Sequence, residues 1–289
     1  MKKQLKQDLK NQETRKNKKY QKLRWFLLIL LVVVTSGALY PVYLQRQVSA
    51  PQRLLNKAIE QESMGQIATA EKLYRELYED YSRTEEAAAA LFHLGKLQQY
   101  DHRDARLALL SYLQLEKEYP ESPLLGAARR ESARLVKYSL RDYSQAIGYY
   151  QRLLEAQDGK ADQYLYEIAD CYFRLENYQQ ARIELETLIE EMPDSPLIAD
   201  ALYRKGGLLL LENRVAEARQ SWAQLIEQYP ESSYRPQAEF NLAKLLEEED
   251  LLAEALKKYE QLTDFPRPAM LQEKIEHLKK RIAAKKKAI

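Results

Sequence analysis

The sequence has few of the residues that build disulfide-bonded, β-rich or low-complexity domains. Among its 289 residues are one cysteine, three histidines, eight glycines and ten prolines. A single cysteine cannot form an internal disulfide, and most of the glycines and prolines fall at the boundaries of a helical pattern, which disfavours a β-rich or low-complexity chain. We therefore expect an all-α protein in which Cys171 is a small buried apolar residue rather than a reactive thiol.

The sequence also lacks the common signatures of catalysis. It contains no glycine-rich phosphate loop, no GxSxG, no HExxH and no cysteine cluster. His277 lies beside Glu273 and Glu276, but helix surfaces rich in glutamate and lysine produce such neighbours by chance. An enzyme that used helical repeats only for docking would need a second domain, and no stretch is left to house one. We predict no enzyme, no cofactor and no metal site.

What the sequence does contain is a pattern that returns about every 35 to 38 residues over residues 51–268, which is typical of stacked helical repeats. The copy at residues 201–232 places apolar residues on two helical stripes separated at Asn213. Tyr229 and Pro230 close it, because proline cannot extend the preceding helix. Each copy therefore predicts a pair of amphipathic helices, and about six pairs fit into one solenoid.

The second helix of each pair repeats three positions. A small residue is followed after four residues by a large one and after three more by a leucine, a combination that lets paired helices interlock. The small residues are Ala70, Ala108, Ala146, Ala181, Ala218 and Ala255; the large ones are Tyr74, Tyr112, Tyr150, Leu185, Trp222 and Tyr259; the leucines are Leu77, Leu115, Leu153, Leu188, Leu225 and Leu262.

These positions resemble the tetratricopeptide repeat, which also has a small residue on its first helix and a closing proline. The small residues are Gly95, Ala169, Gly206 and Ala243, and the prolines are Pro120, Pro193 and Pro230. The closing sequences YPESP, MPDSP and YPESS resemble those of bacterial envelope proteins, among them outer-membrane assembly lipoproteins and the Tol-Pal-associated coordinator of division. The first copy has Ser82 in place of the proline, and the third is irregular, with no closing proline after Leu153.

The amino-terminal residues predict a membrane anchor. Residues 1–24 carry ten lysines and arginines and two acids, which indicates a basic cytoplasmic tail. Trp25 to Leu44 has no charged residue and would be about 30 Å long as a helix, the thickness of a bilayer core. The alternative is a signal peptide cleaved after Ala50, but the apolar run exceeds the ~7 to 15 residues usual for a signal. We predict a retained transmembrane helix at residues 25–44.

Charge also predicts orientation and excludes some partners. The excess of positive charge before the span keeps the amino terminus in the cytoplasm and places the repeats in the periplasm of a bacterial inner membrane. Residues 25–272 contain 28 basic and 39 acidic side chains, so nucleic acid and anionic lipid headgroups are poor partners for this body. Residues 269–289 form a final basic segment whose apolar stripe, Leu271, Ile275, Leu278 and Ile282, predicts a capping helix.

Candidate binding residues lie on the first helices, which line the concave face of such solenoids. Aromatic anchors beside charges are what a peptide-binding groove uses; the alternative is that the aromatic side chains pack between adjacent first helices. The aromatic set is Phe92, Tyr166, Tyr203 and Phe240, and the charged set is Lys96, Arg134, Asp170 and Lys244.

The third copy adds a second candidate feature. Arg130, Arg134 and Lys137 are spaced by four and three residues, which predicts a basic patch on one face of its first helix. The alternative is an ordinary solvated face. Gly207, four residues after Tyr203, predicts open space beside that ring; the alternative is that another side chain fills this space.

Two functions fit this sequence. One is a membrane-anchored scaffold of the bacterial cell envelope that binds segments of partner proteins in its concave face. The other is a periplasmic holdase or translocon accessory protein, anchored in the inner membrane, that binds unfolded clients. The sequence names neither the partner nor the oligomeric state.

Overall fold

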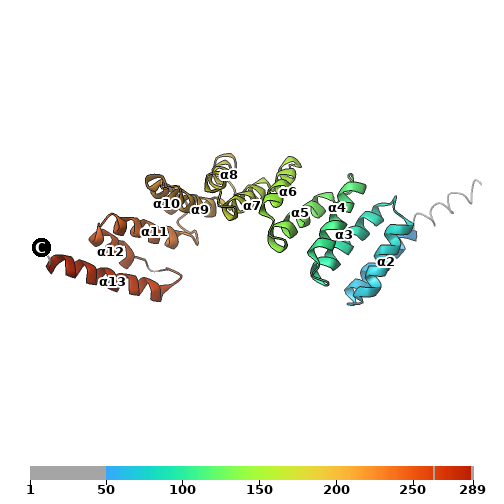
Figure 1. Cartoon of the computed structure of the whole chain (residues 1–289), viewed down its shortest axis with the longest axis horizontal. Coiled ribbons are helices and arrows are strands. Elements are labelled where there is room, and N and C mark those ends of the chain that lie inside the picture. The colour runs from blue at the N-terminus through green and yellow to red at the C-terminus, as the bar shows by residue number, and fades with distance from the viewer. Residues whose placement is uncertain (1–49, 263, 288–289) are drawn as a thin grey trace, which may run out of the picture. The chain divides into compact units, whose positions relative to one another are not determined.

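The computed structural model describes residues 50–262 and 264–287, and throughout these ranges the regular structure is helical, as predicted. The first described helix covers residues 50–63. The others are α2 (Ile67–Asp80), α3 (Glu85–Tyr100), α4 (Ala105–Glu118), α5 (Leu125–Arg134) with the π-helical turn η1 (Leu135–Ser139), α6 (Tyr143–Glu155), α7 (Ala161–Arg174), α8 (Tyr178–Glu191), α9 (Ile198–Leu211), α10 (Val215–Gln228), α11 (Arg235–Glu248), α12 (Leu252–Glu260) and α13 (Pro268–Lys287) (Figure 1).

The predicted basic tail at residues 1–24 and the predicted span from Trp25 to Leu44 lie outside the described residues. Among the helices that are described, none has both the length and the apolar character needed to cross a membrane.

The chain divides into two compact units, Met1–His102 and Arg103–Ile289. In the first unit, α2 packs on α3. In the second, the helices from α4 to α13 pack in chain order, each mainly against its neighbours in sequence. This sequential packing is that of a helical solenoid, because each helix pair buries its apolar faces on the pairs before and after it.

The repeating positions of the second helices form the core. All six alanines have no exposed surface, and the large residues that follow them are at most 3% exposed. The six leucines are at most 8% exposed. The pattern read from the sequence is therefore the packing pattern of the fold, and Cys171 is buried as predicted.

The turn inside each helix pair is also a repeating element. One residue there has a positive φ, between 54° and 73°, and lies five residues before the repeating alanine: Gly65, Arg103, Arg141, Glu176, Asn213 and Asp250. A left-handed residue reverses the chain after a helix and lets the next amide group reach back to the helix end. In the fourth pair, for example, the Asn177 amide nitrogen donates to the Tyr172 carbonyl oxygen at 2.9 Å.

The irregular third pair absorbs one extra residue in its first helix. Ala133 and Ala146 are thirteen residues apart, whereas the small residues Ala169 and Ala181 of the next pair are twelve apart. The π-helical turn η1 accommodates this insertion, since a π-helix bonds residue i to i+5 and so takes one more residue per turn. Ala133 and Ala146 are consequently both fully buried.

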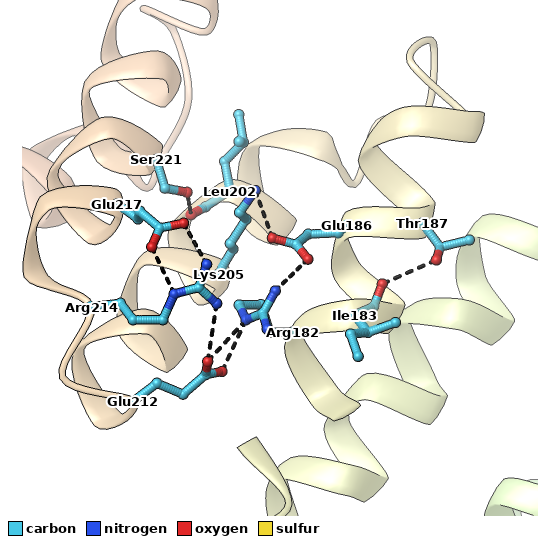
Figure 2. Close-up of polar contacts among 10 residues, drawn as sticks. All are labelled: Arg182, Ile183, Glu186, Thr187, Leu202, Lys205, Glu212, Arg214, Glu217 and Ser221. Atoms are coloured by element: carbon cyan, nitrogen blue, oxygen red, sulfur yellow. Dashed lines mark hydrogen bonds and ion pairs between the residues drawn. The ribbon is translucent and has the colours of Figure 1, made fainter. Parts of the chain in front are cut away.

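Partly buried charges connect the fourth and fifth pairs (Figure 2). The Arg182 side chain on α8 is 11% exposed and donates to Glu186 at 2.5 Å and to Glu212 at 3.0 Å. Lys205 on α9 pairs with Glu186 at 3.1 Å, and Arg214 with Glu212 at 3.2 Å. These pairs tie α8 to α9 and to the turn after it.

The final helix covers the last pair. Leu271, Ile275 and Leu278 of α13 are buried in one apolar cluster with residues of α11 and α12, so the predicted stripe does cap this end of the second unit. Glu247 on α11 is 9% exposed and receives Lys274 at 2.9 Å and Arg281 at 2.6 Å from α13. Both packing and charge therefore hold the cap.

Candidate functional site

An apolar pocket opens on the first helices of the fourth and fifth pairs. Its volume is about 400 Å³. Residues of α7 and α9 form most of its wall, with one residue each from α8 and α11. The lining residues are Tyr166, Ala169, Asp170, Phe173, Leu185, Tyr203, Arg204, Gly207, Leu208, Leu210, Leu211 and Asn241.

Two adjacent glycines of α9 have opposite roles beside this pocket. A Cβ atom on Gly206 would lie 2.3 Å from the Trp222 indole nitrogen, so this glycine is needed for the close approach of α9 and α10. The indole nitrogen donates to the Tyr203 carbonyl oxygen at 3.0 Å. A Cβ atom on Gly207 would meet nothing within 4 Å. Gly207 therefore leaves open space next to Tyr203, as predicted, and the pocket occupies this space.

The polar side of the pocket is an ion-pair network. Arg204 donates to Asp170 and Asp200 at 3.1 Å each, and its guanidinium group lies over the Tyr166 ring at 4.6 Å. The Tyr166 hydroxyl donates to Asp200, and burial together with this bond raises the pKa of Tyr166. Burial opposes ionisation of Asp170, but the hydrogen bond and charge of Lys137 outweigh it, so the pKa of Asp170 lies below its usual value. The tyrosine is thus neutral and the aspartate ionised at neutral pH.

Family models decide what kind of repeat surrounds the pocket. Two models, both described as tetratricopeptide repeat, match residues 135–196 and 200–232. These segments are tetratricopeptide repeats. Together they include every residue that lines the pocket except Asn241. Tetratricopeptide repeats mediate interactions between proteins and are typically not enzymes.

Solved structures agree with this fold. A tetratricopeptide repeat protein from Parabacteroides merdae is 19% identical, with a TM-score of 0.53 over 79% of this chain and 86% of that one. The C-terminal part of a repeat protein from Cytophaga hutchinsonii is 15% identical, with a TM-score of 0.55 over 74% of this chain and 80% of that one. A chain of the Naa15/Naa10 complex bound to HypK-THB is 18% identical, with a TM-score of 0.57 over 82% of this chain but only 35% of that one. These identities show the fold alone. Comparison with curated proteins gives no match.

The predicted aromatic residues of the repeats do not share one role. Tyr166 and Tyr203 line the pocket, and Tyr203 also stacks on Tyr234, with ring centroids 5.3 Å apart. Phe240 instead packs against Phe265 at 4.7 Å, in the cluster under α13. Phe92 belongs to the first unit, where its ring meets His93 edge-on at 6.4 Å. The groove interpretation therefore fits Tyr166 and Tyr203, and the packing interpretation fits Phe240.

The predicted basic patch of the third repeat differs from the structure. Lys137 is only 2% exposed, and its ammonium group pairs with Glu167 and, at 2.8 Å, with Asp170. The sequence spacing assumed an α-helix, but the π-helical turn η1 changes the angle at which Lys137 leaves the helix. The lysine is thereby directed at the acids of α7 instead of at solvent.

The two arginines of this patch also have partners. Arg130 pairs with Asp158 at 2.8 Å, and Arg134, 58% exposed, pairs with Glu131 at 3.3 Å. The three cations therefore do not form one exposed surface.

The remaining charged candidates are separated. Asp170 lines the pocket, whereas Lys244 is exposed on α11 and pairs with Glu248 at 3.5 Å. Lys96 lies in the first unit. Within the described ranges, no three histidine, cysteine, aspartate or glutamate side chains lie close enough together to hold a metal ion.

Sequence reasoning missed the outer wall of the pocket. Phe173 and Leu211 are 43% and 56% exposed there, and Arg204 spans its polar side. A signal was present, because Phe173 lies seven residues after Tyr166, two helical turns along the same face. A large apolar residue such as Phe173 at an exposed position of a helix indicates a binding surface.

Proposed function

We propose that this protein is a membrane-anchored interaction scaffold of the bacterial cell envelope, which binds segments of partner proteins on the first-helix face of its tetratricopeptide repeats. The observation that carries the proposal is the apolar pocket around Tyr166, Tyr203 and Gly207. Binding pockets combine apolar walls with a few placed polar groups, and this one has that composition.

The sequence supports the cellular setting of the proposal. Trp25 to Leu44 is an uncharged run long enough to be the anchor, and the basic residues before it favour a periplasmic location for the repeats. A reporter that is active only in the periplasm, fused after Ile289, should be active. A mature protein lacking its first 44 residues would instead indicate a cleaved signal.

Crosslinking in intact cells tests the binding role. Gly207→Leu places a side chain at the open side of the pocket, since a Cβ atom on this glycine would meet nothing within 4 Å, and it replaces glycine by a better helix former. Gly148→Leu is the matched control, because Gly148 is an exposed glycine of α6 that also has open space around it. We expect partners to be lost from the first variant and kept by the second. Equal recovery from both would contradict pocket binding.

A second function, a holdase for unfolded periplasmic clients, is favoured by the apolar side chains exposed beside the pocket. Phe173 and Leu211, which line the pocket, are 43% and 56% exposed, and Leu175, two residues after Phe173 in sequence, is 45% exposed. The same crosslinking separates the two functions, since a scaffold yields a few fixed partners and a holdase yields a spread of unfolded secreted proteins.

A further inference from the structure

We propose that the occupant of this pocket is an acidic amphipathic helix of the partner, which inserts two apolar side chains one turn apart and places a carboxylate against Arg174 and Arg204. The proposal rests on the proposed function and specifies the chemistry of what binds. Three features of the pocket carry it: its length, its floor and the charge at its mouth.

The length of the pocket matches two helical turns. On α7 the lining residues run from Tyr166 to Phe173, and on α9 from Tyr203 to Leu211. The end residues are seven and eight positions apart, and at a rise of 1.5 Å per residue this gives a wall roughly 11 Å long. A partner helix lying along this wall contacts it through residues spaced by three or four, which is how amphipathic helices fill grooves.

The floor of the pocket lies deep in the repeat. Ala169, Leu185 and Leu208 line it although each is at most 5% exposed. This depth exists because Gly207 contributes no side chain. A leucine or aromatic side chain that entered there would be removed from water on most of its surface, which gives an anchor of the kind that dominates binding energy.

The exposed charges at the mouth of the pocket favour a partner segment of the opposite charge. Asp170 and Asp200 have side chains only 15% and 16% exposed, and both are engaged by arginine. Arg204, which lines the pocket, is 41% exposed. Arg174 is not part of the lining, but it follows the lining residue Phe173 in sequence, is 54% exposed and has its only described ion pair at 3.7 Å with the lining residue Asp170. Of these four charged groups, the two guanidinium groups are therefore the ones most exposed to solvent. They are complementary to a carboxylate, whereas a basic segment would meet them with like charge.

Selection of peptides tests the proposal directly. Short random peptides displayed on phage would be selected on the full-length protein in mild detergent, with the Gly207→Leu protein as competitor. We expect enriched sequences to share two apolar residues spaced by three or four and at least one aspartate or glutamate. One such peptide, labelled with a fluorophore, then serves as the probe for affinity.

Charge reversal at the mouth gives the decisive measurement. Arg174→Glu should weaken the peptide about fivefold to tenfold at low salt and much less at high salt, because partly exposed charges are screened. Arg219→Glu, on the partly exposed face of α10 outside the pocket, is the matched control and should change the affinity little.

Several outcomes would overturn the proposal. They are enrichment of basic or extended sequences, no enrichment at all, an affinity that Arg174→Glu leaves unchanged, and occupation of the pocket by a second copy of this chain. If partners still crosslink in cells and depend on Gly207, the scaffold function stands and only the acidic-helix occupant is rejected.

Discussion

At the scale of single residues, the contact between Gly206 and Trp222 leaves no room for a side chain at position 206. Trp222 is 1% exposed and its ring fills the volume that a side chain on Gly206 would need. The preceding repeat solves the same problem with Ala169 opposite Leu185. A larger side chain on the second helix, such as Trp222, therefore requires a smaller residue on the first helix, such as Gly206, because the space between two packed helices is fixed.

Gly206→Ala should lower the free energy of unfolding by about 1 to 3 kcal/mol, because the added methyl group overpacks the interface. Trp222→Leu in the same chain should recover much of the loss, since it recreates the pairing of the preceding repeat. Urea denaturation of both single variants and the double variant measures the coupling. Additive losses would show that the two residues do not compete for the same space.

Left-handed turn residues offer a second prediction at this scale. Glu176 has a φ of 58°, a conformation that costs a side chain about 1 to 2 kcal/mol and glycine little. Glu176→Gly should therefore raise the free energy of unfolding by about 0.5 to 1 kcal/mol, after allowance for the greater freedom of glycine in the unfolded chain. Glu176→Ala keeps the strain and should give no such gain in thermal denaturation.

At the scale of elements, the π-helical turn η1 decides the electrostatics of the third repeat. It directs Lys137 at Asp170 and Glu167, and it also connects this repeat to the ion pairs of the pocket. Burial lowers the pKa of Lys137, but hydrogen bonds to Asp170 and Glu167 raise it more, so the lysine stays charged. An inserted residue that looks like an irregularity in the sequence therefore has a structural use.

Lys137→Met should lower the free energy of unfolding at neutral pH by about 1 to 3 kcal/mol, because it removes the lysine that pairs with Glu167 and one of the cations that pair with the partly buried Asp170. The pKa of Asp170 is lowered in the folded state, so the stability that this residue adds is present above about pH 4 and is lost as the pH falls through the folded-state value. The raised pKa of Lys137 means that its contribution is lost only at alkaline pH, above about 10.

Urea denaturation of the native protein and of Lys137→Met across the acid range measures this dependence. The difference between the two should shrink below about pH 4. Arg134→Met, which replaces the exposed neighbour on the same segment, is the control and should differ little from the native protein at any pH. A constant difference between native protein and Lys137→Met at all pH values would exclude the ion pair as its cause.

At the scale of the whole molecule, a solenoid distributes its stability repeat by repeat. Leu278 of α13 is fully buried against the last repeat, and removing it leaves a cavity at that end of the second unit. Leu278→Ala should therefore accelerate amide hydrogen exchange in α12 and α13 while the first unit keeps its protection. Faster exchange in α2 and α3 would show a cooperativity that sequential packing does not provide.

The sequence by itself determined the helix pairs. Their period, the fully buried alanines and the large residues beside them are local patterns, and the structure confirms them because each helix packs mainly against its neighbours in sequence. A third of the pocket lining could also be predicted, since Tyr166, Tyr203 and Asp170 occupy repeating positions and Gly207 leaves space. The membrane span at Trp25 to Leu44 stays a prediction from the sequence alone.

Only the tertiary structure decided which of these residues point into the pocket. Tyr203 and Phe240 occupy the same repeat position, yet one lines the pocket and the other packs under α13. Lys137 reads as a surface cation, yet η1 buries it between two acids. The reason is the same in each case. A side chain's exposure depends on what the next repeat places opposite it, and no pattern within one repeat contains that information.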